Sequence, residues 1–232
     1  PSQQIEVKNV APTLGEGAVT DKVFLYTEAQ NPDEQMTAFE DEHGTYIFNS
    51  KDLCMLDSLE DVIKAGVHSL KIEGRVKTQY YVATVIRSYR LALDAIKNGT
   101  YTKEMAERLL LEIKKASHRD FTKGFYYKKP DENDQLYNSS SYIRTYDFVG
   151  LVLDYDKETK IATIEQRNRI FVGDEVEIFG PRDGFETFKI EKMYDDKGEE
   201  IDVAPRAKQI IKIPLPFEVK PWDIMRKQLS DE

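Results

Sequence analysis

The sequence predicts an α/β region followed by a small all-β domain. Two observations carry this prediction. Between residues 82 and 116, apolar residues recur three and four positions apart, which is typical of helices with one buried face. From Tyr146 onward the apolar period becomes two, and turns rich in Asp, Gly and Lys separate short runs. Evenly spaced short strands of this kind favour a small barrel or sandwich.

The α/β assignment depends on the stretch between residues 59 and 98. A short helix is expected over 59–65, and a long helix follows the N-cap candidate Thr78. Between them, Val67, Leu70 and Ile72 predict a compact strand. A helix, a strand and a second helix in this order are typical of a unit with a parallel strand.

The remaining elements follow the same reasoning. Strands are expected at 23–26 and 45–48, with a loop over 29–43, and another helix begins after Thr102. Residues 117–144 read as a connector with little periodicity. In the last part, short strands are expected at 148–153, 161–165, 175–179, 185–193, 209–213 and 223–226.

The composition excludes some classes of protein. A formal net charge of −9 over 232 residues argues against a general nucleic-acid coat protein, which needs an excess of Lys and Arg. The single cysteine excludes an internal disulfide and suits a reducing compartment. No apolar run is long enough to span a bilayer and no signal peptide is recognisable, so we expect a cytoplasmic protein.

A charged triplet follows the expected strand at 67–72. Lys71, Glu73 and Arg75 would cluster at its carboxyl end, the edge where parallel α/β folds bind ligands. In the functional interpretation, Arg75 makes a bidentate contact to a carboxylate or phosphate, and Glu73 holds it or acts as an acid or base. The alternative is an ion pair that pins the loop between strand and helix.

A second group lies in the connector, where residues 118–129 are dense in aromatic and basic residues. Aromatic rings can stack on bases and lysines can meet phosphates, so this segment is a candidate for nucleic-acid binding. The alternative is that Phe121, Phe125 and Tyr127 pack the connector against the flanking domains. The nucleic-acid-binding candidates are Lys123, Tyr126, Tyr127 and Lys128.

Several separate stretches resemble the collagenase-like peptidase family U32. In the first half they are Tyr-Ile-Phe-Asn-Ser-Lys-Asp-Leu-Cys at 46–54, Ser-Leu-Lys-Ile-Glu-Gly-Arg at 69–75 and Tyr-Tyr-Val-Ala-Thr at 80–84. In the second half, stretches similar to the C-terminal β-barrel domain of that family lie at 149–152, 162–168, 173–177, 202–205 and 221–223. The resemblance covers roughly residues 45–228.

The resemblance implies a fold and a division into domains. Residues 1–100 would form the end of a (β/α) barrel, 101–145 a helix and connector, and 146–232 a small β-barrel like those of translation factors. The family signature, a His-Gly followed by two spaced cysteines around a Tyr-Ser-Gly, is not found in residues 1–44. The chain is therefore expected to be the C-terminal part of a longer protein.

The resemblance also implies a function. Family members were first described as peptidases that act on collagen, and closer relatives hydroxylate the wobble uridine of tRNA with prephenate and an iron–sulfur cluster. We therefore expect a tRNA-modifying enzyme, inactive as this chain alone, with Lys71, Glu73 and Arg75 as its catalytic residues. Cys54 falls at the position of the last of four cluster ligands, with the others upstream of residue 1; alternatively it is a free, buried thiol.

Two other functions stay open. The first is a collagenase-like peptidase whose β-domain docks a protein substrate. Within these residues no arrangement of Ser, Cys and His supports nucleophilic proteolysis and no zinc-protease helix is recognisable. The second is a β-domain that serves only as an interaction module.

Overall fold

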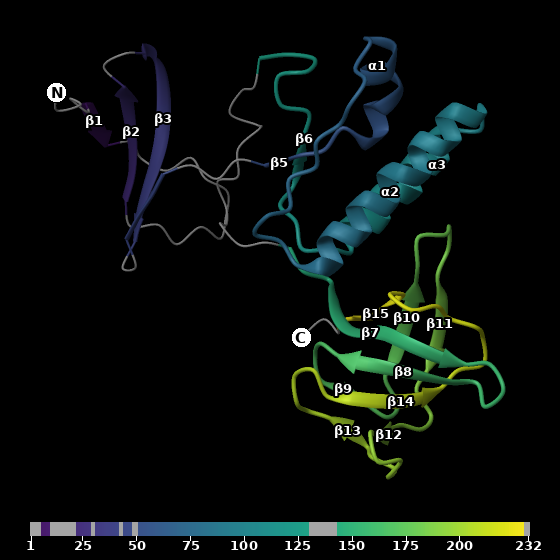
Figure 1. The fold of residues 1–232 in the computed structure, drawn as a ribbon. Coiled ribbons are helices and arrows are strands. Elements are labelled where there is room, and N and C mark those ends of the chain that lie inside the picture. Colours follow the sequence, from purple (N-terminus) through teal and green to yellow (C-terminus); the bar gives the residue numbers. More distant parts are fainter. Residues whose placement is uncertain are drawn as a thin grey trace. The chain divides into compact units, whose positions relative to one another are not determined.

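The computed structural model describes residues 6–9, 22–28, 31–41, 44–47, 51–129 and 143–229 of the 232-residue chain (Figure 1). The chain divides into two compact units. The first comprises Pro1–Cys54 and Arg119–Ser141, and the second comprises Met55–His118 and Tyr142–Glu232. Each unit is therefore assembled from two separate pieces of the sequence.

The first unit contains an antiparallel four-stranded sheet in the order β1-β2-β3-β4. Its strands are β1 (Glu6–Asn9), β2 (Lys22–Glu28), β3 (Asn31–Asp41) and β4 (Gly44–Ile47). The strands expected at 23–26 and 45–48 are confirmed as β2 and β4. The loop expected over 29–43 is wrong, because β3 pairs with β2 on one side and with β4 on the other. Pairing with two neighbours outweighs the weak strand propensity of this polar run.

The first unit also contains a short parallel pair. β5 (Asp52–Leu53) lies beside β6 (Phe121–Thr122), with Asp52 opposite Phe121. A parallel pair requires a long crossover connection, and here the helices of the second unit lie between the two strands in the sequence. The first half of the chain therefore mixes helices with parallel and antiparallel strands.

The second unit begins with helices. After a 3₁₀ turn η1 (Leu56–Ser58) come α1 (Leu59–Lys64), α2 (Gln79–Asn98) and α3 (Lys103–Lys114), and α2 and α3 lie side by side (Figure 1). The Thr78 and Thr102 hydroxyls cap α2 and α3 by accepting from the backbone N–H three residues on, each at 3.2 Å. Gly99 ends α2 at a φ of 69°, a left-handed value that glycine adopts without strain.

The strand expected from Val67 to Ile72 is wrong. The described chain between α1 and α2 has no strand pairing, and Val67, Leu70 and Val76 expose 43%, 38% and 92% of their surface. A buried parallel strand needs neighbours to satisfy its backbone N–H and C=O groups. No strand among the described residues offers that pairing to residues 67–72.

A curled antiparallel sheet forms the C-terminal part of the second unit (Figure 1). Its seven strands run in the order β11-β10-β15-β7-β8-β14-β12. The end strands β11 and β12 do not pair with each other in the described part of the chain, so the sheet is a half-barrel and not a closed barrel. The strands are β7 (Tyr146–Asp156), β8 (Ile161–Gln166), β10 (Glu175–Phe179), β11 (Glu186–Lys189), β12 (Tyr194–Asp195), β14 (Ile210–Pro214) and β15 (Ile224–Gln228), with β9 (Ile170–Phe171) and β13 (Val203–Ala204) as a separate pair.

The central strands of the sheet bury side chains on both faces. Consecutive residues of a strand point to opposite faces, so neighbours in the sequence belong to different clusters. Val152, Ile178 and Met225 belong to the core inside the half-barrel. Their neighbours Leu151, Phe179 and Ile224 belong to a second cluster, together with Tyr80 of α2 and Ala116 after α3. The half-barrel therefore packs its outer face against the helices. Within the described ranges, no helix is long and apolar enough to cross a membrane.

Gly150 of β7 provides a test of this core. A Cβ at this position would lie 2.7 Å from Cγ2 of Ile164 and 2.8 Å from Cε of Met225. We expect Gly150→Ala to lower the free energy of unfolding by about 1–3 kcal/mol through overpacking, measured by denaturant titration. Glu158→Ala, in an exposed turn, is the control and should change it by less than about 0.5 kcal/mol. Equal midpoints for both variants would contradict the tight packing described here.

Candidate functional site

The charged triplet lies in the segment between α1 and α2, which has no helix or strand. Lys71, Glu73 and Arg75 are all exposed, and the Arg75 backbone N–H donates to Oε1 of Glu73 at 2.8 Å. Among the described residues no ion pair joins the three side chains. Their roles as anion-binding or acid–base groups stay a prediction.

Cys54 follows β5 and is buried, with 4% of its surface exposed. Its backbone N–H donates to the Thr122 carbonyl at 3.0 Å, which extends the pairing of β5 with β6. A cluster held by protein thiolates needs about four cysteines, and this chain has one. Within the described residues, no group of His, Cys, Asp and Glu has an arrangement that could hold a metal ion. These residues therefore do not by themselves fit an iron–sulfur cluster.

The aromatic and basic residues of the connector form an exposed turn directly after β6. Phe125, Tyr126 and Tyr127 expose 80%, 59% and 57% of their surface. The turn is closed by a hydrogen bond from the Tyr126 N–H to the Lys123 carbonyl at 3.2 Å. We call residues 123–129 the aromatic turn. The interpretation that Phe125 and Tyr127 are packed away as core residues does not agree with these exposures.

The lysines of the aromatic turn differ from one another. Lys128 and Lys129 are exposed, whereas Lys123 is half-buried and its Nζ donates to the Cys54 carbonyl at 3.0 Å. Burial lowers the pKa of Lys123 from its ordinary value. Lys123 therefore holds the turn against β5, and Tyr126, Tyr127 and Lys128 are the predicted residues that face solvent.

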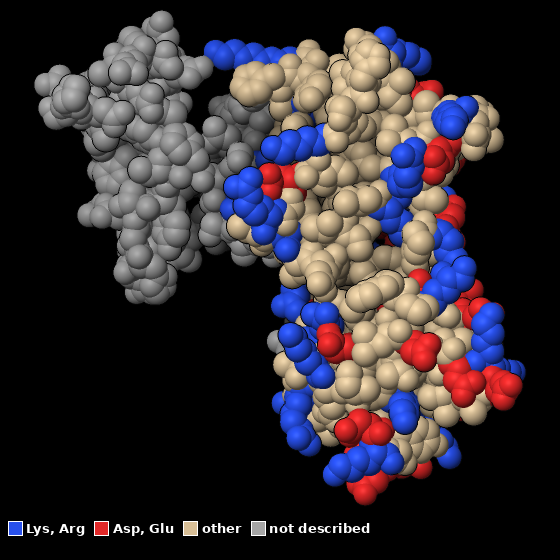
Figure 2. Space-filling view, viewed as in Figure 1, with Lys and Arg blue, Asp and Glu red and all other residues tan. Residues whose placement is uncertain are grey.

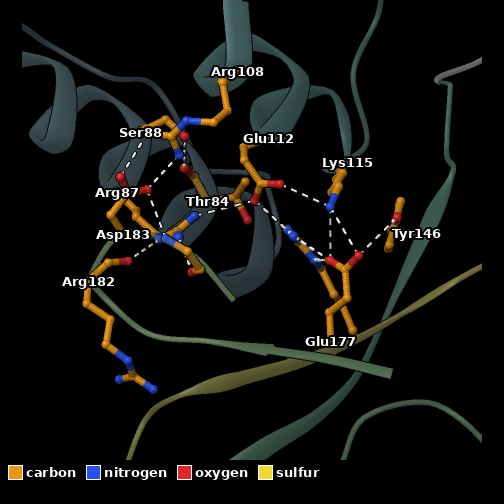
Figure 3. Close-up of polar contacts among 12 residues, drawn as sticks. Thr84, Arg87, Ser88, Arg108, Glu112, Lys115, Tyr146, Glu177, Arg182 and Asp183 are labelled. Carbon is orange, nitrogen blue, oxygen red and sulfur yellow. Dashed lines mark hydrogen bonds and ion pairs between the residues drawn. The ribbon is translucent and has the colours of Figure 1, made fainter. Parts of the chain in front are cut away.

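A buried ionic network joins α3 to the half-barrel (Figure 3). At its centre is Arg226 of β15, which has no exposed surface. Its Nε lies 2.6 Å from Oε2 of Glu177 on β10, and its Nη2 lies 2.9 Å from Oε2 of Glu112 on α3. Lys115 completes the network, with Nζ 3.0 Å from Glu112 Oε1 and 3.0 Å from Glu177 Oε2.

Aromatic rings surround the same guanidinium. The Arg226 Cζ lies 4.7 Å from the ring centre of Phe179 and 5.3 Å from those of Tyr146 and Phe185. Rings at these distances stabilise a cation that has lost its water. Burial alone would raise the pKa of Glu112, but the charges of Arg226 and Lys115 outweigh it and hold the pKa below its usual value.

The network also fixes the loop between β10 and β11. Arg87 of α2 is buried, and it donates from Nε to the Arg182 carbonyl at 2.9 Å and from Nη2 to the Gly184 carbonyl at 2.5 Å. Arg108 of α3 makes a bidentate pair with Asp183, at 2.6 and 2.8 Å (Figure 3). Residues 180–185 are therefore attached to both long helices.

Sequence reasoning did not find these residues. The apolar spacing of α2 predicts a buried stripe that includes Ile86 and leaves Arg87 largely outside it, but Ile86 is 49% exposed and Arg87 is buried. One signal was available for Glu112, which falls on the α3 face that carries Leu109, Ile113 and Ala116. A charged residue on such a face indicates a buried ion pair.

The comparisons with known proteins identify the family. The model of Peptidase family U32 matches residues 21–136, and that of the Peptidase family U32 C-terminal domain matches residues 144–226. The chain therefore belongs to peptidase family U32, which confirms the resemblance seen in the sequence.

The relatives carry two kinds of name. The chain is 49% identical over 205 residues to tRNA hydroxylation protein P of Haemophilus influenzae, covering 88% of this chain and 44% of the relative. It is 42% identical over 221 residues to tRNA hydroxylation protein P of Escherichia coli, covering 94% and 47%. It is 31% identical over 185 residues to a Collagenase of Porphyromonas gingivalis, covering 79% and 50%. The chain thus spans about half the length of these curated relatives.

The chain is also similar to a solved structure. The C-terminal domain of a U32 peptidase from Geobacillus thermoleovorans is 48% identical in sequence. The match covers 35% of this chain and 99% of that chain, with a TM-score of 0.34.

Removal of one carboxylate tests the ionic network. We expect Glu112→Gln to lower the free energy of unfolding by about 3–5 kcal/mol. Arg226 and Arg87, whose Nη1 lies 3.4 Å from Glu112 Oε2, would keep buried charges with less compensation. Chemical denaturation at neutral pH measures this loss. Glu107→Gln, whose exposed carboxylate on the same helix lies 3.7 Å from Lys103, is the control and should cost at most about 0.5 kcal/mol.

The same pair of variants has a pH signature. A carboxylate with a lowered pKa contributes stability that is complete above its ordinary value of 4.5 and is lost as the pH falls through the folded-state pKa. The wild-type chain and Glu107→Gln should both lose this stability in acid, whereas Glu112→Gln should lack that part of the decline. Parallel profiles of stability against pH for all three proteins would contradict a lowered pKa of Glu112 in the folded chain.

Proposed function

We propose that this chain is part of a tRNA-modifying enzyme of family U32 that hydroxylates the wobble uridine. The observation that carries the proposal is the 49% identity, over 88% of the chain, to a protein named for tRNA hydroxylation. Proteins with the same kind of name match at 42% and 38%, whereas the proteins named Collagenase match at 31%. A cytoplasmic location follows from a tRNA substrate.

The catalytic part of the proposal concerns residues 1–100. The parallel pairing of β5 with β6 supports an origin in a (β/α) barrel, whose other strands would come from the additional length that the relatives have. In that setting the exposed segment between α1 and α2 would gain neighbours, and Lys71, Glu73 and Arg75 would stand at the mouth of the barrel. Residues 101–145 would connect it to the β-domain at 146–232.

The charged triplet suits an anionic co-substrate. Prephenate carries two carboxylates. Lys71 and Arg75 are exposed cations, and Glu73 is the acidic residue that lies between them in the sequence. A guanidinium binds a carboxylate through two parallel hydrogen bonds, which fixes its orientation. Cys54 would supply at most one thiolate to an iron–sulfur cluster, so the remaining ligands of such a cluster would have to come from outside this chain.

The aromatic turn is the proposed tRNA contact of the first unit. Tyr126 and Tyr127 offer exposed rings on which unpaired bases can stack, and Lys128 offers a cation for the phosphates. Lys123 supports the turn from its buried side. Basic and acidic side chains are interspersed on the half-barrel in the face that Figure 2 shows, so RNA binding would depend on local contacts and not on one broad basic surface.

Protein hydrolysis is the second candidate, because relatives named Collagenase cover 79% of the chain. The two functions differ in their products. In a strain that lacks the full-length gene, mass analysis of anticodon nucleosides should show loss of hydroxylated uridine, and restoration of the gene should recover it. Unchanged nucleosides together with gelatin cleavage by the purified full-length protein would favour the peptidase.

Arg75 can be tested in the same system. We expect Arg75→Ala in the full-length protein to lower formation of hydroxylated uridine about 10- to 100-fold, the loss typical of one charge-assisted contact to substrate. The protein should remain folded, because the Arg75 side chain is exposed. Arg90→Ala removes an exposed arginine of α2 and should leave the reaction unchanged. Equal activity of the two variants would remove Arg75 from the site.

The aromatic turn has its own test. Tyr126→Ala combined with Tyr127→Ala should weaken tRNA binding about 5- to 100-fold in a filter-binding assay, because stacking of bases is lost. Lys128→Ala should weaken binding less and reduce its dependence on salt by about one phosphate contact. Lys97→Ala, an exposed lysine at the end of α2, is the control. Equal affinity for all variants would assign the exposed rings another role.

A further inference from the structure

The turn at residues 220–223 exposes an aromatic side chain to solvent, and the backbone of that residue has an unfavourable conformation. Trp222 is the only tryptophan of the chain, and 74% of its surface is exposed. Its φ is 75°, in the left-handed region that bulky residues rarely adopt. Neither burial nor backbone preference favours an indole here, and such conformations persist only where the surroundings impose them.

The surroundings that impose it centre on Asp223, which is 1% exposed. Its carboxylate accepts from the Lys220 N–H at 3.0 Å and from the Arg182 guanidinium at 3.0 and 3.4 Å. Strand β7 fixes the backbone of the turn. The backbone N–H of Trp222 donates to the Val152 carbonyl at 2.8 Å, and the backbone N–H of Val152 donates to the Asp223 carbonyl at 2.9 Å. A Cβ at Gly180 would collide with the Asp223 carboxylate. The turn is therefore rigidly held.

Two cationic residues belong to this turn or pair with it. Arg182 pairs with the residue next to Trp222 while 43% of its side chain remains exposed, and Lys220 is exposed two positions before it. The acidic residues nearest in the sequence to Trp222 and to Arg182 already have cationic partners, and Asp223 pairs with Arg182 itself. Glu218 pairs with Lys157 at 2.8 Å, and Asp183 pairs with Arg108.

We propose that Trp222 is a stacking platform for an unpaired base of the RNA substrate, with Arg182 and Lys220 meeting the adjacent phosphates. The inference rests on the proposed tRNA-modifying function and adds a contact on the half-barrel. Exposed aromatic rings together with cationic residues are what proteins use to hold single-stranded nucleic acid. A protein interface would instead need an apolar core of several residues. No other large, exposed apolar side chain of the described ranges belongs to this turn.

The fluorescence of Trp222 reports on this contact directly, because the 232-residue chain has no other tryptophan. Titration with an unmodified tRNA transcript should quench the emission. Trp222→Ala should bind the transcript about 5- to 100-fold more weakly, and Trp222→Phe should keep most of the affinity. Phe171→Ala removes another exposed ring of the half-barrel and should bind like the wild-type chain.

Trp222→Gly separates a binding role from a structural one. Glycine adopts a φ of 75° without strain, and the exposed indole contributes little burial, so this variant should unfold at the same temperature as the wild-type chain or higher. Its affinity for the transcript should nevertheless fall as far as that of Trp222→Ala. A fall in thermal stability together with unchanged affinity would show that the indole serves the fold, and would overturn the inference.

The other outcomes are equally distinct. Binding of tRNA without quenching, or with equal affinity for Trp222→Ala, overturns the inference and leaves the proposed function intact. Quenching by gelatin and not by tRNA assigns the turn to a protein partner and also overturns it. Absence of any tRNA binding by the wild-type chain overturns it as well, while analysis of the anticodon nucleosides judges the proposed function separately.

Discussion

The second unit depends on one buried charge. Arg226 has no contact with solvent, and the cost of desolvating its guanidinium is offset only where Glu112, Glu177 and the surrounding rings are in place. Because those groups come from α3, β10 and β15, the helices and the outer face of the half-barrel must meet in one arrangement. An apolar contact alone would tolerate sliding, whereas paired charges with fixed hydrogen-bond directions do not. The loop at 180–185 is attached to the same helices through Arg87 and Arg108.

Local signals in the sequence were sufficient for much of this fold. The caps at Thr78 and Thr102 and the strands after Tyr146 follow from residue type and period, and the structure contains them. Pairing was not predictable in the same way. Residues 31–41 form a strand because neighbours lie on both sides, and residues 67–72 do not because the described chain supplies none. Charged residues in a helix are ordinarily assigned to the solvent-exposed face, so the burial of Arg87 could not be predicted from residue type. The sequence predicted Tyr126 and Tyr127 of the aromatic turn as candidates for nucleic-acid binding. Only the structure shows that their rings are exposed.

Family membership and function are separate conclusions for this chain. Both family models match, yet the relatives include proteins named for tRNA hydroxylation and proteins named Collagenase. The same scaffold can therefore carry different chemistry, and the function has to be argued from particular side chains. The candidates here are an exposed charged triplet, an exposed aromatic turn and an exposed indole on the turn that Asp223 holds. Each can be changed without disturbing the buried charges around Arg226, so binding and folding can be measured independently.

The open curl of the sheet has a consequence for solubility at high concentration. A half-barrel leaves two border strands whose outward backbone groups can recruit another chain and begin aggregation. Here one border is β12, only two residues long, and the other is β11, which carries Glu186 and Lys189 at its ends. The short length of β12 and the charged residues of β11 both disfavour the addition of a strand from another chain. A sheet of this kind can therefore remain unclosed without recruiting another chain.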